Sequence, residues 1–239
     1  MPTAEDFKRA MVVTAHPDDA EWGCSSTVAK WCRLGWDVIY VLCTDGSKGT
    51  EDRSITSEEL AEIRAKEQIN AGKTLGLTNV EFLGYPDGYL EPTLNVRKDI
   101  SRQIRKWKPD VLITTSPSRD LGNSSYIGHP DHFAAGEAAL SAVFPSARDH
   151  LTFPELLEDE GLEPHKVREV WVMTYGDNAN YWNPVTERDV ETSISALQDH
   201  VSQISNPEEA GKWMKKRRAK LGEKIGADYA ESFLKFILS

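Results

Sequence analysis

Two His-Pro-Asp tripeptides carry the residue types in this chain that are best suited to metal-assisted hydrolysis. The first lies within His16-Pro17-Asp18-Asp19 and the second within His129-Pro130-Asp131-His132. Imidazole nitrogens and carboxylate oxygens are donors that zinc accepts, and a catalytic zinc keeps three protein ligands and one position open for water. The two tripeptides lie more than a hundred residues apart. One shared site is therefore possible only if the fold brings them together.

The segments around the tripeptides alternate between short apolar runs and amphipathic stretches. These patterns predict strands at 10–15, 37–44, 80–85, 110–115 and 169–175, and helices at 21–34, 57–75, 96–107 and 131–144. Ser57 is the candidate cap of the second helix. After a proline-containing excursion at 145–167, we expect residues from 189 onward to be largely helical.

This alternation of strands and helices favours parallel pairing through right-handed crossovers. We therefore predict an α/β fold, a Rossmann-like, doubly wound and mostly parallel sheet of order 3-2-1-4-5. Helices would cover both faces, and a helical C-terminal part would follow. No interdomain linker stands out, so we expect one domain over residues 1–239.

The predicted topology brings the two tripeptides to one place. In this sheet order strands 1 and 4 are neighbours, and ligands bind beyond their carboxyl ends. The first tripeptide follows strand 1 and the second follows strand 4 through a loop. Each alone could be a strand-to-helix turn with an incidental histidine, because Pro and Asp favour helix starts. Their joint placement favours a functional site. A dinucleotide site is disfavoured, since the first turn lacks Gly-x-Gly-x-x-Gly.

Composition excludes several classes of function. The formal net charge is −10 with no clustered basic face, which argues against nucleic-acid binding. The N-terminal residues lack the layout of a secretory signal, and no apolar stretch approaches the roughly 18 residues of a membrane helix. We expect a cytoplasmic protein without a membrane partner. The 3 cysteines are predicted to be reduced core thiols.

Further motifs accompany the tripeptides along nearly the whole chain. They are Ala15 to Glu21, Thr44-Asp45-Gly46, Arg64-x-x-Glu67, Lys108-Pro109-Asp110-Val111, His129 to His132 and His200-x-Ser202-Gln203. At these motifs the sequence resembles the LmbE-like, or PIG-L, family of metal-dependent N-acetylglucosaminyl deacetylases. The later segments look most like the diacetylchitobiose deacetylase branch. Ser25-Ser26, where a Gly pair is usual, departs from the family pattern.

The resemblance implies a role for each polar residue of the two tripeptides. His16, Asp19 and His132 would bind Zn²⁺, or alternatively Fe²⁺, Co²⁺ or Mn²⁺. Asp18 would be the general base, because adjacent carboxylates do not easily serve identical roles. His129 would stabilise the oxyanion and protonate the departing amine, and Asp131 would orient His129 and raise its pKa. The products would be acetate and a free amine.

Substrate recognition is predicted less specifically. Arg64, Asp45 and Tyr126 are candidates to bind the substrate, although an Arg on an amphipathic helix is often solvated and loop aromatics are common. The resemblance implies a small N-acetylated sugar or glycoconjugate as substrate and a homo-oligomer, a trimer or hexamer. Two alternatives stay open. One is a metal-dependent amidase acting on another amide, such as a thiol-glucosaminide conjugate, and the other is a non-catalytic sugar- or metal-binding protein.

Overall fold

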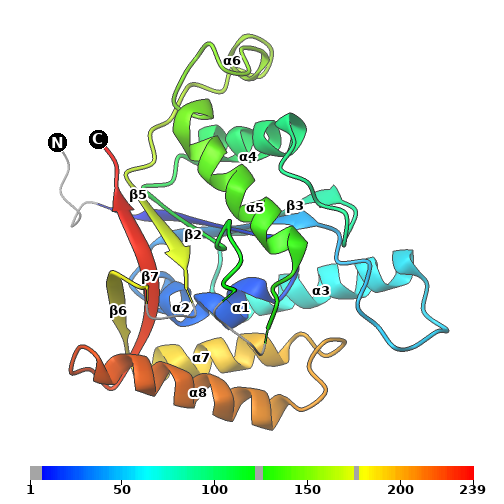
Figure 1. Ribbon diagram of the computed structural model, residues 1–239, viewed down its shortest axis with the longest axis vertical. Helices are drawn as coiled ribbons and strands as arrows, with labels where there is room; N and C mark the ends of the chain where they lie inside the picture. Colours follow the sequence, from blue (N-terminus) through cyan, green and yellow to red (C-terminus); the bar gives the residue numbers. More distant parts are fainter. Residues whose placement is uncertain (1–6, 122–125, 175–177) are drawn as a thin grey trace.

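A seven-stranded mixed sheet forms the centre of the molecule in the computed structural model, which describes residues 7–121, 126–174 and 178–239 (Figure 1). Its strands are β1 (Arg9–Thr14), β2 (Asp37–Thr44), β3 (Asn79–Tyr85), β4 (Val111–Thr114), β5 (Glu169–Met173), β6 (Tyr181–Val185) and β7 (Tyr229–Ile237). Their order is β3-β2-β1-β4-β5-β7-β6, and β1 to β5 pair in parallel. The predicted order 3-2-1-4-5 is confirmed.

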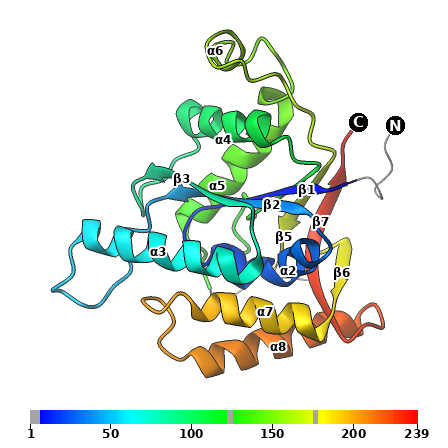
Figure 2. The ribbon, with the colours of Figure 1, turned by 180° about the vertical axis from the view of Figure 1, so that it is seen from behind.

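Helices cover both faces of this sheet. They are α1 (Asp19–Gly23), α2 (Ser25–Arg33), α3 (Ser57–Leu75), α4 (Leu94–Trp107), α5 (Pro130–Ser141), α6 (Glu155–Glu158), α7 (Glu187–Gln198) and α8 (Pro207–Glu223), with a π-helical turn at Ala142–Ser146. Helices α4 and α5 lie on one face, and α1, α2 and α3 lie on the other, with α7 and α8 outside them (Figures 1 and 2). Among the described residues, no helix is both long and apolar enough to cross a bilayer.

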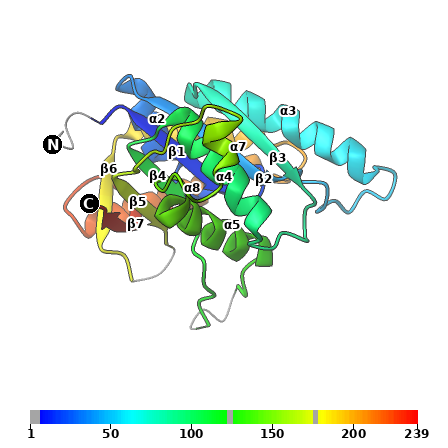
Figure 3. The ribbon, with the colours of Figure 1, turned by 90° about the horizontal axis from the view of Figure 1, so that it is seen from above.

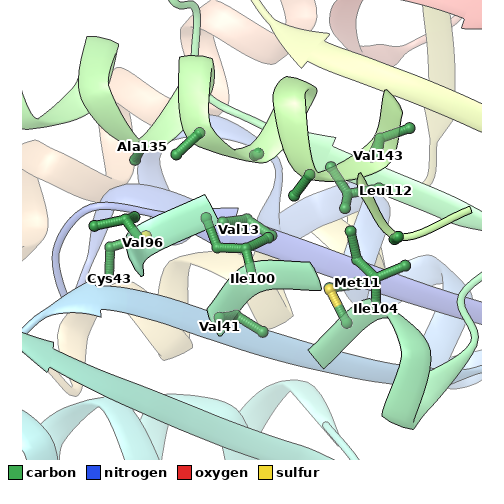
Figure 4. Packing of buried hydrophobic residues seen from close by; sticks show 14 of the residues in the cluster. Met11, Val13, Val41, Cys43, Val96, Ile100, Ile104, Leu112, Ala135 and Val143 are labelled. Atoms are coloured by element: carbon green, nitrogen blue, oxygen red, sulfur yellow. The ribbon is translucent and has the colours of Figure 1, made fainter. Parts of the chain in front are cut away.

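Period-two alternation along the central strands builds a core on each face. Met11, Val13 and Val41 face α4 and α5, where they pack with side chains such as Ile100 and Ala135 (Figure 4). The residues between them in sequence enter the opposite core, beneath α2 and α3. Burying each large apolar side chain contributes roughly 1.5–3 kcal/mol. The two cores together fix β1 and β4 in the middle of the sheet (Figure 3).

The C-terminal part differs from the prediction. Helices α7 and α8 occur, but the chain ends in a strand, β7, which pairs antiparallel with β5 and β6. Glu231 and Ser232 are buried in β7 and interrupt its apolar pattern, which hides the strand in the sequence. Strand β6 contains Pro184, which is tolerated because β6 lies at the edge of the sheet. The expectation that residues from 189 onward are largely helical is wrong for the final strand.

Two helix boundaries also differ. The helix predicted at 21–34 is broken at Cys24, where φ of −147° separates α1 from α2. The cap of α3 is Thr56 rather than Ser57. The Thr56 hydroxyl accepts a hydrogen bond from the Glu59 backbone N–H, and the Glu59 carboxylate accepts one from the Thr56 N–H. This capping box satisfies two otherwise unpaired donors.

Candidate active site

The two tripeptides meet at the carboxyl ends of β1 and β4. His16 follows β1, whereas His129 is the N-cap of α5 and His132 lies in its first turn. The rings of His16 and His132 have centroids 5.2 Å apart, and those of His16 and His129 are 4.6 Å apart. The predicted convergence of the tripeptides is confirmed. Pairing of β1 with β4 brings the two loops together.

Two ring nitrogens and the two oxygens of one carboxylate lie close together. His16 Nδ1 lies 3.3 Å from His132 Nε2 and 3.5 Å from an Asp19 carboxylate oxygen, and His132 Nε2 lies 2.9 Å from the other Asp19 oxygen. Donors about 2.1 Å from a zinc ion at tetrahedral angles are about 3.4 Å from one another. Two imidazoles and one carboxylate at these separations fit a divalent cation such as zinc. The rings of His16, His129 and His132 also lie close enough to share an ion.

The other ring nitrogen of His16 faces carboxylates. His16 Nε2 lies 3.0 Å from Asp87 Oδ1 and 3.2 Å from Asp131 Oδ2. A carboxylate on the outer nitrogen of a ligand histidine fixes its tautomer and ring orientation. Burial alone would lower the pKa of His16, but the surrounding carboxylates outweigh that effect and raise its pKa to about 12. The electrostatics of the site therefore favour positive charge.

The adjacent carboxylates of Asp18 and Asp19 point to different places. Asp18 has φ of 90°, a conformation that costs a non-glycine residue about 1–3 kcal/mol. Asp19 contacts the histidines, whereas an Asp18 oxygen lies 3.9 Å from Arg64 Nη2. Burial and the charge of Asp19 raise the pKa of Asp18 to about 7. Burial would raise the pKa of Asp19 as well, but His132 outweighs it and the pKa is lowered. Such divergence is typical of paired carboxylates with separate roles.

His129 is the most exposed histidine of the cluster, with 39% of its side chain accessible. Its Nδ1 accepts a hydrogen bond from the Asp131 backbone N–H at 3.2 Å, which assigns the proton of the neutral ring to Nε2. Burial lowers the pKa of His129 and His16 lowers it further, while Asp131 raises it only in part. Asp131 raises this pKa as expected, but burial and the charge of His16 outweigh it, so the net shift is downward.

Asp131 orients His16 more directly than His129. It is buried, and its carboxylate accepts backbone N–H bonds from Gly88 at 2.8 Å and Leu90 at 3.3 Å as well as the contact with His16. The distance from an Asp131 oxygen to His129 Nδ1 is 3.9 Å. Asp131 therefore ties the loop after β3 to His16.

The residues predicted to bind substrate occupy different surroundings. Arg64 is 4% exposed, and its guanidinium donates to the carbonyls of Pro17 at 2.8 Å and of Gly46 and Lys48 at 3.2 Å. Gly46 has φ of 65°, and a Cβ there would lie 3.1 Å from the Pro17 ring. An Asp45 oxygen accepts the N–H groups of Ser47 and Asp87. These contacts hold the loop after β2 against the first tripeptide.

Tyr126 differs from that pair because it is 59% exposed, three residues before His129. Leu121 and Ile127 on the same segment are also exposed. A sugar-contacting role for Tyr126, and a substrate-binding role for Arg64 and Asp45, remain predictions.

Asp87 and Gln68 also belong to the site, although the motifs in the sequence did not predict them. Asp87 follows β3, so its place beyond a parallel strand was a usable signal. Gln68 lies one helical turn after Arg64, on the same face of α3. The motif at 200–203 contacts this region, because Glu67 accepts hydrogen bonds from the Ser202 N–H and hydroxyl, each at 2.7 Å.

Known proteins resemble this chain in sequence and in structure. A model of the GlcNAc-PI de-N-acetylase family, PIG-L, matches residues 11–143. A diacetylchitobiose deacetylase of Thermococcus kodakarensis is 33% identical over 199 residues, which span 83% of this chain and 71% of the relative. An N,N'-diacetylchitobiose deacetylase of Pyrococcus horikoshii, solved with an inhibitor, superimposes with a TM-score of 0.86 at 31% identity, over 98% of this chain and 85% of that chain.

A third relative is named an amidase rather than a deacetylase. The mycothiol S-conjugate amidase of Streptomyces coelicolor is 30% identical over 184 residues, which cover 68% of this chain. The matched region spans 60% of the length of that relative.

Proposed function

This chain belongs to the PIG-L family, and from that membership and its His/Asp site we propose that it is a metal-dependent N-deacetylase of an N-acetylglucosamine-type sugar. Its reaction hydrolyses the acetamide bond and releases acetate and a free amine. The observation that carries the proposal is the convergence of His16, Asp19 and His132 donors within 2.9–3.5 Å of one another. Asp18 and His129 flank them with groups able to exchange protons.

In this mechanism His16 Nδ1, an Asp19 oxygen and His132 Nε2 would hold the cation. A divalent cation bound there would supply a water of lowered pKa and a Lewis acid for the acetyl carbonyl. The carboxylate of Asp18 accepts the proton of the attacking water, since Asp18 is beside the ligands without being one of them. The Nδ1 of His129 accepts the Asp131 N–H, so its Nε2–H is left to donate a hydrogen bond to the oxyanion. The proton that Asp18 accepts from water then passes to the departing nitrogen as the C–N bond breaks.

The nature of the sugar rests on the relatives. Two diacetylchitobiose deacetylases are 31–33% identical to the chain, one over 83% of it in sequence and one over 98% in structure. We therefore take a short N-acetylglucosamine oligosaccharide such as diacetylchitobiose as the first substrate. A thiol-glucosaminide amide is the second candidate, because the mycothiol S-conjugate amidase is 30% identical. Loops outside the shared site decide between such substrates.

The test is acetate release by metal-loaded protein from N-acetylglucosamine, diacetylchitobiose and an N-acetylglucosaminyl thiol conjugate. We expect release from diacetylchitobiose, and its loss in Asp18→Asn at an unchanged metal content. Asp159→Asn, which changes an exposed carboxylate on another loop, serves as the matched control and is expected to retain activity. Undiminished release by Asp18→Asn would refute its role as the base, and no release from any substrate would refute the deacetylase.

A further inference from the structure

The peptide unit between Pro17 and Asp18 is held at both of its polar atoms by one helix. Arg64 Nη2 donates to the Pro17 carbonyl at 2.8 Å, and the Asp18 N–H donates to Gln68 Oε1 at 3.2 Å. Arg64 and Gln68 are four residues apart on α3 and therefore lie on one face of it. Both side chains are buried, with exposed fractions of 4% and 0%. One helical turn of α3 thus fixes the orientation of a single peptide plane.

That peptide plane precedes a residue in a costly conformation. Asp18 has φ of 90°, a region that sterics close to most residues other than glycine. Such a backbone persists where the surrounding structure determines it from several sides. The Asp18 carbonyl is held as well, because it accepts the Trp22 N–H at 3.1 Å in the first turn of α1. In this backbone conformation the Asp19 carboxylate points toward the histidines, whereas the Asp18 carboxylate does not.

Gln68 is itself oriented by a buried chain of polar groups. Its Nε2 donates to Glu21 Oε1 at 3.1 Å, which fixes which end of the amide faces Asp18. The other Glu21 oxygen lies 3.4 Å from His200 Nε2. Glu21, Gln68 and His200 are each fully buried. This series of polar contacts extends from the loop between α7 and α8 to the backbone N–H of Asp18.

We propose that Gln68, together with Arg64, is a positioning residue that aims the Asp18 carboxylate for proton transfer. Neither side chain needs to touch substrate for this role. The proposal rests on the proposed function, in which Asp18 is the base. Gln68 accepts the Asp18 N–H, and Arg64 donates to the Pro17 carbonyl. Glu21 orients the Gln68 amide.

Gln68→Met tests the role, because methionine keeps the length of the side chain and removes both hydrogen bonds. Misplacing a reacting group by about 1 Å can cost about 100-fold in rate. We expect kcat to fall about 10- to 100-fold with KM within about 3-fold and the bound metal per chain unchanged. The Asp18 amide should exchange its hydrogen faster by a similar factor. Gln103→Met is the matched control, a buried glutamine on α4 whose Oε1 has no partner, and it should leave kcat unchanged.

A reciprocal exchange guards against simple loss of folding. Gln68→Glu alone places two buried carboxyl groups side by side and should lower kcat at least 10-fold. Adding Glu21→Gln restores an amide opposite a carboxylate, so that residue 68 again accepts the Asp18 N–H. We expect the double variant to recover kcat to within about 5-fold of the parent and to protect the Asp18 amide again.

The results separate this inference from the proposed function. Parental kcat in Gln68→Met, in a protein that Asp18→Asn inactivates, would overturn the positioning role and leave the deacetylase intact. A double variant that regains the stability of the parent but not its kcat would also overturn the positioning role. Hydrogen exchange at the Asp18 amide reports directly on its hydrogen bond to Gln68. Faster exchange in Gln68→Met would therefore support that hydrogen bond even if Asp18 were not the base.

Discussion

Arg218 of α8 and Glu231 of β7 form a buried ion pair, with 2.7 Å between Nη2 and a carboxylate oxygen. Their side chains are 1% and 3% exposed. The same carboxylate accepts the backbone N–H groups of Ser26 at 3.1 Å and Thr27 at 2.8 Å, at the start of α2. A negative charge there complements the positive end of the helix dipole. The C-terminal strand thereby stabilises α2, which follows the turn that carries Asp18 and Asp19.

Removing that carboxylate should destabilise the fold strongly. Glu231→Gln leaves the Arg218 charge buried without its counter-ion, and breaking a buried pair in this way costs about 3–5 kcal/mol. Urea unfolding measures the loss. The control is Glu208→Gln, which breaks an exposed pair with Lys212 and should change stability by less than about 1 kcal/mol. A loss below about 1 kcal/mol for Glu231→Gln would contradict the stabilising role of the pair.

Metal should raise the melting temperature of the protein. An ion that binds only the folded chain stabilises it by about 2.7 kcal/mol at a free concentration of one hundred times Kd. We expect chelator to lower Tm and stoichiometric zinc to restore it. His132→Ala should abolish the response, whereas His150→Ala, which changes an exposed histidine outside the site, should keep it. A full metal response in His132→Ala would remove that residue from the ligand set.

Asp189 should make stability depend on pH in the acid range. Burial would raise its pKa, but the Arg33 guanidinium and the Thr186 donors outweigh that effect and hold the pKa below its ordinary value of 3.8. The folded state therefore favours the charged form. The stability from this carboxylate is full above pH 3.8 and is lost as the pH falls toward the lower folded value.

Comparison with Asp189→Asn measures this contribution. We expect the variant to be less stable than the parent by about 1 kcal/mol at pH 7, because it loses the charge that pairs with Arg33 and caps α7. The difference should shrink as the pH falls below 3.8, where the carboxyl protonates first in the unfolded chain and then, at lower pH, in the folded one. Asp159→Asn should give no such convergence. A difference that stays constant from pH 7 to pH 3 would contradict the lowered pKa.

The sequence allowed the meeting of the two tripeptides to be predicted, because strand order and parallel pairing alone bring the ends of β1 and β4 together. It did not allow β7 to be predicted. Glu231 breaks the apolar pattern of that strand, and its partners are Arg218 on the preceding helix and the N–H groups of Ser26 and Thr27 near the other end of the chain. A polar residue buried by such tertiary contacts leaves no local periodic signal.

The histidines that meet at the site lie in short motifs, whereas the residues that support them carry a weaker sequence signal. His16 and His132 are metal-binding residue types in short motifs. Asp87 contacts His16, and Gln68 contacts the backbone of Asp18. Their positions after β3 and one turn after Arg64 are weak signals, because the contacts themselves arise only in the folded chain. The positive φ of Asp18 could not be predicted either, because it depends on hydrogen bonds from α3 rather than on the Pro-Asp-Asp sequence.

Close contact of α5 with the end of β4 should position His132. A Cβ on Gly136 would lie 2.4 Å from the Thr115 carbonyl oxygen, and the Thr115 hydroxyl donates to the His132 carbonyl at 2.6 Å. Gly136→Ala must therefore push α5 away from backbone that cannot yield, which costs about 1–3 kcal/mol. Because this movement carries His132, we expect metal affinity to fall about 10- to 100-fold, as when groups outside the ligands are altered.

Calorimetric zinc titration and urea unfolding together test that coupling. Gly72→Ala is the control, because its new methyl group would meet the Val80 and Leu77 side chains at 3.1 and 3.2 Å rather than backbone. Side chains can shift by a few tenths of an ångström, so this variant should keep its zinc affinity. If Gly136→Ala loses stability but binds zinc as tightly as the parent, contact between α5 and β4 stabilises the fold without positioning His132.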